Sequence, residues 1–493
     1  MSNDHASTPV TPATATSGLP TFTRRAVVTA SASALLAGGL TARPALTAPA
    51  FLRQGEKITI PLFTTENDPN SLNFFERTIS AFQEQYPDVG VEITLYQDEN
   101  QLEYITTAFE TGTDLGIFAP GSANIAAWAE QGYLLPLTPM IERIGEDDFL
   151  PGTRIVVDGE DYAMPVQSNA SALWVRRDLL DGAGLPIPTT YEEYLGAVPA
   201  LHGKDGLIGV SSGVGAVPQL TLQYFTPYIH QSGWDYFDHA GNLTFNQPAV
   251  LDAINRFVEI MKYTSPSLYN ATFQDILTAF ISGRAAFGTF PGRMGVNLAA
   301  QNPELAEKVT VVATPAGPFM TGQLLFGGIQ HMVVYAKTAH PEETLAFLEF
   351  MTTGERSLDF AMTVPGHLLP PLESVRALVP TYQSDFMSKY GDWVITLNNL
   401  VPNAFSPALS MGAVADNVYY GRLSNLCPWA QRLWGGPPID GTMFQQILIE
   451  GKAPDAAWTE AAEKMRAESD AWKAENPDWA PLPAPEPVAT PAA

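Results

Sequence analysis

The chain has 493 residues, a length that predicts two or three domains or one large two-lobed domain and excludes a small disulfide-stapled scaffold. Hydrophobic residues make up 45% and charged residues 16%, so there is enough apolar material for packed cores and wholesale disorder is excluded. The net charge of −26 repels phosphate backbones and argues against nucleic acid as a partner, and the single cysteine, Cys427, excludes internal disulfides and multi-cysteine metal sites.

The first 50 residues are predicted to be an export signal. Thr23-Arg24-Arg25 precedes a weakly apolar, uncharged run at 26–42, which is shorter than the ~20 strongly apolar residues that a membrane span needs. An arginine pair before such a run resembles a twin-arginine signal, and Ala48 and Ala50 predict cleavage before Phe51. No cysteine stands directly after this run, where a lipoprotein would carry one, so a lipoprotein anchor is not expected. An uncleaved N-terminal anchor is the alternative interpretation.

Strands and helices alternate along the next part of the chain. The apolar spacing predicts strands at 57–63, 89–96 and 114–118, each followed by a helix, and these helices begin near Asn70, Leu102 and Ser122. Three consecutive strand–helix units predict a mainly parallel sheet covered by helices. A hairpin with its turn at Asp158-Gly159 follows.

The strand–helix pattern then repeats in a second region. Strands are predicted at 172–175, 207–210, 285–289, 309–313 and 329–335, and helices at 218–231, 248–263, 272–282 and 341–352. Thr190 and Glu193 form a capping box that predicts another helix start. From Leu372 onward the pattern is mainly helical, and the Pro- and Ala-rich end of the chain, 476–493, is predicted to be a disordered tail.

Nine short segments, spread over nearly the whole mature chain, stand in a recognisable order: 63–67, 119–137, 158–165, 173–179, 188–191, 282–288, 327–329, 341–347 and 451–462. Their order and spacing resemble the extracellular solute-binding proteins of ABC importers, of the carbohydrate-binding, maltose-binding-protein-like type. The missing lipobox cysteine and the segment 420–429 depart from the family pattern.

The resemblance implies a two-lobed α/β fold of the periplasmic-binding-protein type (type II), with a hinge between the lobes. Lobe 1 is expected to comprise 51–165 and 319–372, and lobe 2 to comprise 166–318 and 373–475. The implied function is capture of a sugar or oligosaccharide between the lobes, outside the inner membrane, and its delivery to the permease subunits. A monomer without cofactor or enzymatic activity is expected.

Ligands of open α/β sheets lie beyond the carboxyl ends of the strands, so the loops there supply the candidate binding residues. These are polar, glycine and aromatic residues that can hydrogen-bond or cover a sugar: Glu66, Asn67, Ser122, Gln167, Asn169, Phe290, Arg293, Gly327, Gly328 and Gln330. Four further aromatics are candidates for stacking on a sugar ring: Tyr224, Trp234, Tyr419 and Trp429. Each of these positions also has a structural explanation, as a helix cap, a turn or a core residue.

Two enzymatic alternatives remain at this stage. The segment Gly209-Val210-Ser211-Ser212-Gly213 matches the nucleophile elbow of α/β-hydrolases. In such an elbow a helix begins at the nucleophile, whereas here residues 214–217 separate Ser211 from the next predicted helix. A glycosidase needs only two facing carboxylates, which counting cannot exclude. The histidines show no metal-binding spacing.

Charge narrows the class of ligand. Few of the 26 basic residues fall on the candidate loops, so a neutral sugar is expected. Arg293 is the exception, because one guanidinium can bind either adjacent hydroxyls or a carboxylate. An anionic polyol or an acid sugar, of the glycerol-phosphate kind, is therefore the alternative.

Overall fold

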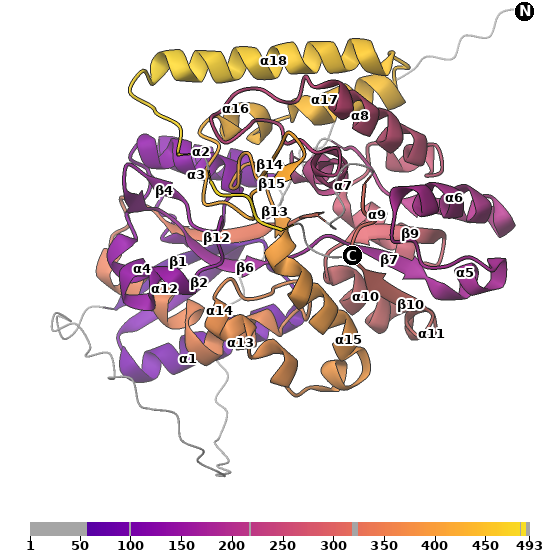
Figure 1. Cartoon of the computed structure of the whole chain (residues 1–493). Helices are drawn as coiled ribbons and strands as arrows, with labels where there is room; N and C mark the ends of the chain where they lie inside the picture. Colours follow the sequence, from indigo (N-terminus) through magenta and orange to yellow (C-terminus); the bar gives the residue numbers. More distant parts are fainter. Residues whose placement is uncertain (1–56, 98–99, 216–217, 318–323, 484, 490–493) are drawn as a thin grey trace, which may run out of the picture. The chain divides into compact units, whose positions relative to one another are not determined.

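Two β-sheets, each covered by helices, form the framework of the protein (Figure 1). The computed structural model describes residues 57–97, 100–215, 218–317, 324–483 and 485–489. The predicted export signal lies outside the described residues. Within them, no helix combines the length and the apolar character that crossing a membrane requires.

The first sheet has the strand order β2-β1-β3-β12-β6. Its strands are β1 (Ile58–Thr64), β2 (Val89–Leu95), β3 (Ile117–Phe118), β6 (Met164–Ser168) and β12 (Ile329–Val334). Its helices are α1 (Pro69–Gln85), α2 (Gln101–Thr111), α3 (Ser122–Glu130), α4 (Thr138–Ile144), α12 (Pro341–Thr352) and α13 (Gly354–Ala361). Apolar residues at helical spacing on α1, Phe74, Phe75 and Phe82, pack against Ile60 and Leu62 of β1, which explains why this helix covers the sheet.

The second sheet has the strand order β10-β7-β9-β8. Its strands are β7 (Ala172–Arg176), β8 (Ile208–Ser211), β9 (Ala285–Phe290) and β10 (Val309–Val312). The helices around it are α5 (Arg177–Ala183), α6 (Tyr191–Leu201), α9 (Phe273–Ile281), α10 (Arg293–Gln301), α11 (Pro303–Ala306) and α15 (Asp385–Leu400). The capping box predicted at Thr190 and Glu193 is present at the start of α6.

A helical block packs around a third, aromatic core. Its helices are α7 (Pro218–His230), α8 (Pro248–Met261), α16 (Ala430–Trp434), α17 (Ile439–Leu448) and α18 (Pro454–Glu475). Within it, Phe444 packs edge to face on both Phe225 and Phe257, and the rings of Phe225 and Phe257 are tilted toward each other. The shorter elements are β4 (Val156–Val157), β5 (Glu160–Asp161), β11 (Leu325–Phe326), α14 (Glu373–Arg376), β13 (Ala404–Phe405), β14 (Val414–Ala415) and β15 (Val418–Tyr419).

The strand directions differ from the predicted, mainly parallel sheets. β1 is parallel to β2 and β3, and β8 is parallel to β9, but β12 runs antiparallel to β3 and β6, and β7 runs antiparallel to β9 and β10. The parallel rule applies to consecutive strand–helix units, whereas β12 joins the first sheet only after the chain has passed through the second. Both sheets are therefore mixed.

The predicted lobe boundary at residue 165 falls inside β6. This strand pairs with β12 from Met164 to Ser168, so it belongs to the first sheet over its whole length. The chain passes to the second sheet between Ser168 and Ala172, where β7 begins. The polar stretch from Gln167 to Ser171, between the apolar residues of β6 and those of β7, marks this passage in the sequence more closely than residue 165 does.

The described part of the C-terminal tail lies against the body of the protein, in contrast to the predicted disorder. The Trp479 ring packs against the rings of Trp429 and Trp472, with centroids 5.6 and 6.0 Å apart. Farther along, the Val488 amide donates a hydrogen bond to the Tyr419 carbonyl oxygen over 2.9 Å. The packing of one aromatic ring and one backbone hydrogen bond cannot be predicted from a Pro- and Ala-rich composition.

The buried carboxyl of Asp440 in α17 makes the stability of the protein dependent on pH. Burial raises its pKa to about 6, although the Tyr236 hydroxyl donates a hydrogen bond to it over 2.7 Å. Because the pKa is higher in the folded than in the unfolded chain, this group stabilises the fold below about pH 4, and that contribution is lost as the pH rises through 6.

Asp440→Asn is therefore expected to be more stable than the wild type at pH 8, by about 3 kcal/mol, while the difference shrinks at pH 4. Urea unfolding measured from pH 4 to 8 checks this expectation. Asp252→Asn, an exposed aspartate of α8, is the control and should follow the wild type. A pH profile of Asp440→Asn that parallels the wild type would show that the carboxyl does not titrate in this range.

Candidate functional site

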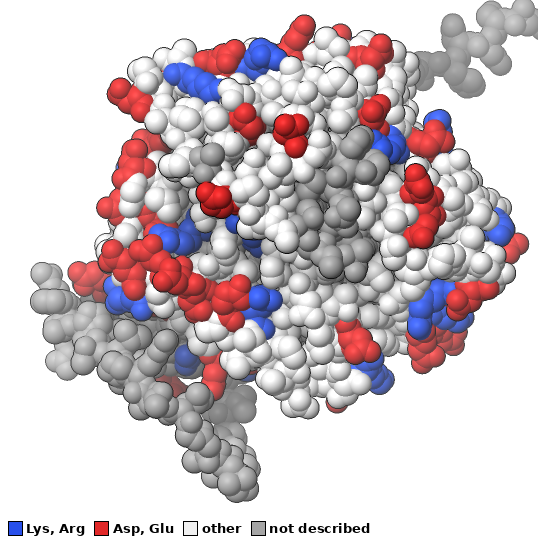
Figure 2. All heavy atoms as spheres, viewed as in Figure 1, with Lys and Arg blue, Asp and Glu red and all other residues white. Residues whose placement is uncertain are grey.

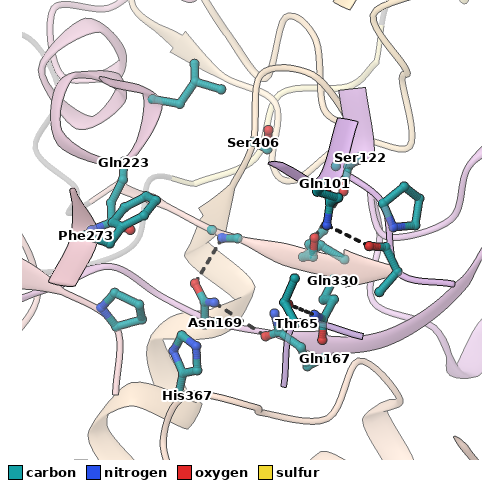
Figure 3. Close-up of a pocket in the computed structure, with 18 of the residues that line it drawn as sticks. Thr65, Gln101, Ser122, Gln167, Asn169, Gln223, Phe273, Gln330, His367 and Ser406 are labelled. Atoms are coloured by element: carbon teal, nitrogen blue, oxygen red, sulfur yellow. Dashed lines mark hydrogen bonds between the residues drawn. The ribbon is translucent and has the colours of Figure 1, made fainter. Parts of the chain in front are cut away.

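Loops from both sheets meet around a cavity of about 400 Å³ (Figure 3). The first sheet contributes residues 65–67 after β1, 119–122 after β3, Gln167 and Asn169 at the end of β6, and 327–330 at the start of β12. The second sheet contributes Phe290, Pro291 and Arg293 after β9. α7 adds Leu222 and Gln223, α9 adds Phe273 and Gln274, and α16 adds Trp434. The cavity thus lies at the carboxyl ends of β1, β3, β6 and β9, in keeping with the loop argument, and at the amino end of β12, which runs antiparallel to β3 and β6.

Amide side chains of the lining are held by hydrogen bonds to one another and to the backbone. The Asn169 amide donates to Gln167 Oε1 over 3.4 Å, and Asn169 Oδ1 accepts from the Gly328 amide over 3.1 Å. The Gln330 amide donates to the Thr65 hydroxyl over 3.3 Å. A Cβ at Gly328 would lie 2.9 Å from Asn169 Oδ1, so a larger residue here would displace the Asn169 amide. The amides are therefore positioned before any ligand enters.

Arg293, the first residue of α10, is bound by two carboxylates. Its Nη2 lies 2.9 Å from Glu66 Oε2, and its Nη1 bonds to Asp68 Oδ2. Burial acts to lower the pKa of Arg293, but the two carboxylates outweigh burial and raise it. The ion pairs join the loop after β1 of the first sheet to the helix after β9 of the second.

A buried histidine lies directly behind Ser122. The Ser122 Oγ is 3.0 Å from His331 Nδ1 and 3.1 Å from the Ile329 carbonyl oxygen. The other ring nitrogen, His331 Nε2, is 2.6 Å from the Thr153 carbonyl oxygen. Ser122 was predicted to cap α3, but the capping position is occupied by Gly121, so the hydroxyl is left for the cavity and for His331.

Ten of the sequence-predicted site residues line the cavity. They are Glu66, Asn67, Ser122, Gln167, Asn169, Phe290, Arg293, Gly327, Gly328 and Gln330. They stand on loops, at strand ends or, for Ser122 and Arg293, at the first residue of a helix, and the rule for α/β sheets identifies such positions without knowledge of the packing.

The other four candidates, all aromatic, lie outside the lining. Trp429 is fully buried in the helical core, where Tyr224 also packs, and Trp234 is half-buried against that core. Tyr419 is buried beside Phe405. On α7, Leu222 and Gln223 face the cavity, and the next residue, Tyr224, points about 100° away around the helix axis. The sequence predicts which helices carry aromatic residues, but it does not predict which face of each helix lines the cavity.

Sequence reasoning missed several lining residues that share an apolar or aromatic character. They include Tyr96, Phe273, Phe326, His367 and Trp434. Trp434 ends α16, five positions after the predicted Trp429, and no local pattern distinguishes the two. His367 has a pKa well below its usual value, because of burial and the nearby Arg293 charge, so it is neutral.

Ser211 has a structural role in β8. Its buried hydroxyl donates to the Ile276 carbonyl oxygen over 2.5 Å, and α7 begins only at Pro218. His331, a histidine that lies downstream of Ser211 as the chain order of an α/β-hydrolase requires, stands in the other sheet and contacts Ser122. The geometry of a nucleophile elbow is thus not formed here. Within the part of the chain that the structure describes, there is also no group of three or more His, Cys, Asp or Glu side chains that could hold a metal ion.

The chain is similar to solute-binding proteins in sequence and in structure. It is 26% identical to the mannitol-binding protein of Pseudomonas aeruginosa over 243 residues, which are 48% of this chain and 55% of that protein. The crystal structure of the GacH receptor of Streptomyces glaucescens, studied unliganded and with acarbose, superposes with a TM-score of 0.67 at 20% identity, over 86% of this chain and all of that one.

A third similar protein is UgpB of Mycobacterium tuberculosis, solved in complex with glycerophosphocholine. Its TM-score is 0.67 at 18% identity, over 84% of this chain and 99% of that chain. These structures confirm the two-lobed, maltose-binding-protein-like fold. The model of the bacterial extracellular solute-binding protein family matches residues 68–355, more than half of the chain. The chain therefore belongs to the bacterial extracellular solute-binding protein family.

Proposed function

We propose that the protein captures a neutral sugar or polyol in this cavity, outside the inner membrane, and delivers it as a monomer to the permease subunits of an ABC importer. The observation that carries the proposal is the lining of positioned amides and hydroxyls beside aromatic rings. Amides both donate and accept hydrogen bonds, as sugar hydroxyls do, and rings such as Phe273 and Trp434 can cover the apolar face of a sugar. The mannitol- and acarbose-binding relatives support this class of ligand.

The state of Arg293 argues against an anionic ligand. Among the described residues that line the cavity, Arg293 is the one arginine, and both of its terminal nitrogens already bond to carboxylates. An anion would have to compete with Glu66 and Asp68 for the guanidinium and would meet their negative charge.

The proposal includes no chemical step. Glu66 is the one carboxylate among the described lining residues, and a glycosidase needs a second one across the cleft. Acidic side chains are spread over the face shown in Figure 2, in keeping with the net charge of −26, and a field of this sign repels anionic ligands at longer range.

The ligand class is tested by thermal shift against a panel of neutral sugars, polyols, sugar acids and glycerol phosphate. Neutral members are expected to raise the unfolding temperature, and a ligand at 100 times its Kd adds about 2.7 kcal/mol. Asn169→Ala should abolish most of the shift, whereas Ser211→Ala, which removes a buried hydroxyl away from the cavity, should keep it. A shift produced by the anions alone would replace the neutral-sugar proposal.

Export and processing are a separate expectation. The Arg24-Arg25 pair and the small residues at 48 and 50 predict that residues 1–50 are absent from the mature protein. Mass spectrometry of the protein recovered outside the inner membrane should give a mass that starts at Phe51. Replacing both arginines by lysine is expected to leave the precursor inside the cell, and export at the normal rate would exclude the twin-arginine route.

A further inference from the structure

We propose that His331 is a positioning residue for ligand binding: its Nδ1 accepts a hydrogen bond from the Ser122 hydroxyl, so that Ser122 presents only lone pairs to the cavity. The ligand must then donate a hydrogen bond at this point. The proposal rests on the proposed function of the cavity as a site for a hydroxyl-bearing ligand.

The proton of the imidazole is located by the partner of Nε2. His331 is fully buried in β12, and its Nε2 lies 2.6 Å from the carbonyl oxygen of Thr153. A carbonyl oxygen can only accept a hydrogen bond, so Nε2 carries a proton.

The imidazole carries no second proton at neutral pH. Burial lowers the pKa of His331 to about 4; the hydrogen bond to Thr153 opposes this shift, and the charge of Arg422 adds to it. A neutral imidazole has one proton, and this proton is already on Nε2. Nδ1 therefore keeps its lone pair and can only accept.

The Ser122 hydroxyl has one proton and two nearby acceptors. These are His331 Nδ1 at 3.0 Å and the Ile329 carbonyl oxygen at 3.1 Å. If the proton pointed at Ile329, the lone pairs of Oγ and Nδ1 would face each other, and a buried acceptor would lose its donor. Such a loss costs about 1–3 kcal/mol. A carbonyl oxygen has two lone pairs and can accept from another donor, whereas Nδ1 has one lone pair, and among the described residues Ser122 is its hydrogen-bond partner. The proton therefore points to Nδ1.

The consequence is an acceptor on the cavity wall that cannot reverse its role. A free serine hydroxyl rotates to donate or to accept, but Ser122 has committed its proton. Gln330, on the same strand as His331, also lines the cavity, and its Oε1 is a buried acceptor without a hydrogen-bond partner in the described part of the chain. A hydroxyl or N–H of the ligand fits here, whereas an ether oxygen or a fluorine does not.

The imidazole state is tested first, without any ligand. In a ¹⁵N spectrum of the histidine-labelled mature protein, His331 should show the Nε2–H form unchanged from pH 5.5 to 8. Ser122→Ala should move the Nδ1 resonance toward that of a nitrogen without a donor, and Ser211→Ala should not move it. Because a His331 variant can fail to fold, the signal is identified by replacing the other histidines of the mature chain one at a time. An Nδ1–H form, or an Nδ1 resonance unaffected by Ser122→Ala, would overturn the proposal.

The specificity is tested with the tightest ligand of the panel and its deoxy and deoxyfluoro analogues. At one hydroxyl, both analogues should bind the wild type about tenfold more weakly, because neither can donate. In Ser122→Ala that penalty should fall to about twofold or less, while Ser211→Ala retains it. Fluoro analogues that bind as well as the parent at every position would contradict the proposal. If no panel member binds, the proposed function fails, and the ¹⁵N spectrum still decides the role of His331.

Discussion

Arg293→Ala is expected to weaken binding of the panel ligand by tenfold or more. In the wild type, the guanidinium joins Glu66 and Asp68 of the first sheet to α10 of the second. Its removal leaves two carboxylates close together, and the side chain of Glu66 is only 6% exposed. A hydrogen bond to a charged group contributes about 1.5–3 kcal/mol, and each 1.4 kcal/mol changes the affinity tenfold.

Arg176→Ala is the matched control. Arg176 also binds one carboxylate through two nitrogens, Nε and Nη2 on Asp178, but it lies on β7 and outside the cavity lining. Calorimetric titration should show nearly wild-type affinity for Arg176→Ala and the loss for Arg293→Ala. Adding Glu66→Gln to Arg293→Ala should restore part of the affinity if charge repulsion causes the loss. Wild-type affinity in folded Arg293→Ala would mean that the ion pairs do not shape the site.

The sequence was sufficient to predict the framework of the site because that framework is local. Strand ends, capping residues and glycines are recognisable from neighbouring residues, and the loops with Glu66, Asn169 and Gly328 follow directly from them. Arg293 and Glu66, which form an ion pair, are 227 positions apart in the chain, and no local sequence pattern predicts their contact. The same holds for Ser122 and His331, which are 209 positions apart.

The directions of the strands and the orientations of the aromatic side chains could not be predicted from neighbouring residues either, for a different reason. The antiparallel placement of β12 depends on where the chain returns after the second sheet, which is a property of the whole topology. The role of an aromatic residue depends on which residues pack against its ring in the folded protein. Trp434 lines the cavity and Trp429 packs against other aromatic rings, although Trp429 directly precedes α16 and Trp434 is its last residue.

The different surroundings of these two tryptophans lead to an expectation about stability. Trp429 is fully buried among the rings of Phe237, Trp472 and Trp479, at centroid distances of 5.1, 5.8 and 5.6 Å. Lys473 lies over its ring at 4.8 Å. Trp429→Ala should therefore lower the free energy of unfolding by about 3–5 kcal/mol, from lost burial and the remaining cavity. Ligand affinity of the folded fraction should stay within about twofold of the wild type.

Trp479→Ala and Trp434→Ala separate the two effects. Trp479 contacts the same aromatic group from the tail but is only half-buried, so its removal should cost less than that of Trp429. Trp434 is buried and lines the cavity, so Trp434→Ala should reduce both stability and affinity. Urea unfolding with calorimetric titration at a temperature where all variants are folded measures both quantities. If Trp429→Ala loses affinity as strongly as Trp434→Ala while its unfolding is unchanged, then Trp429 contacts the ligand and its place in the helical core is wrong.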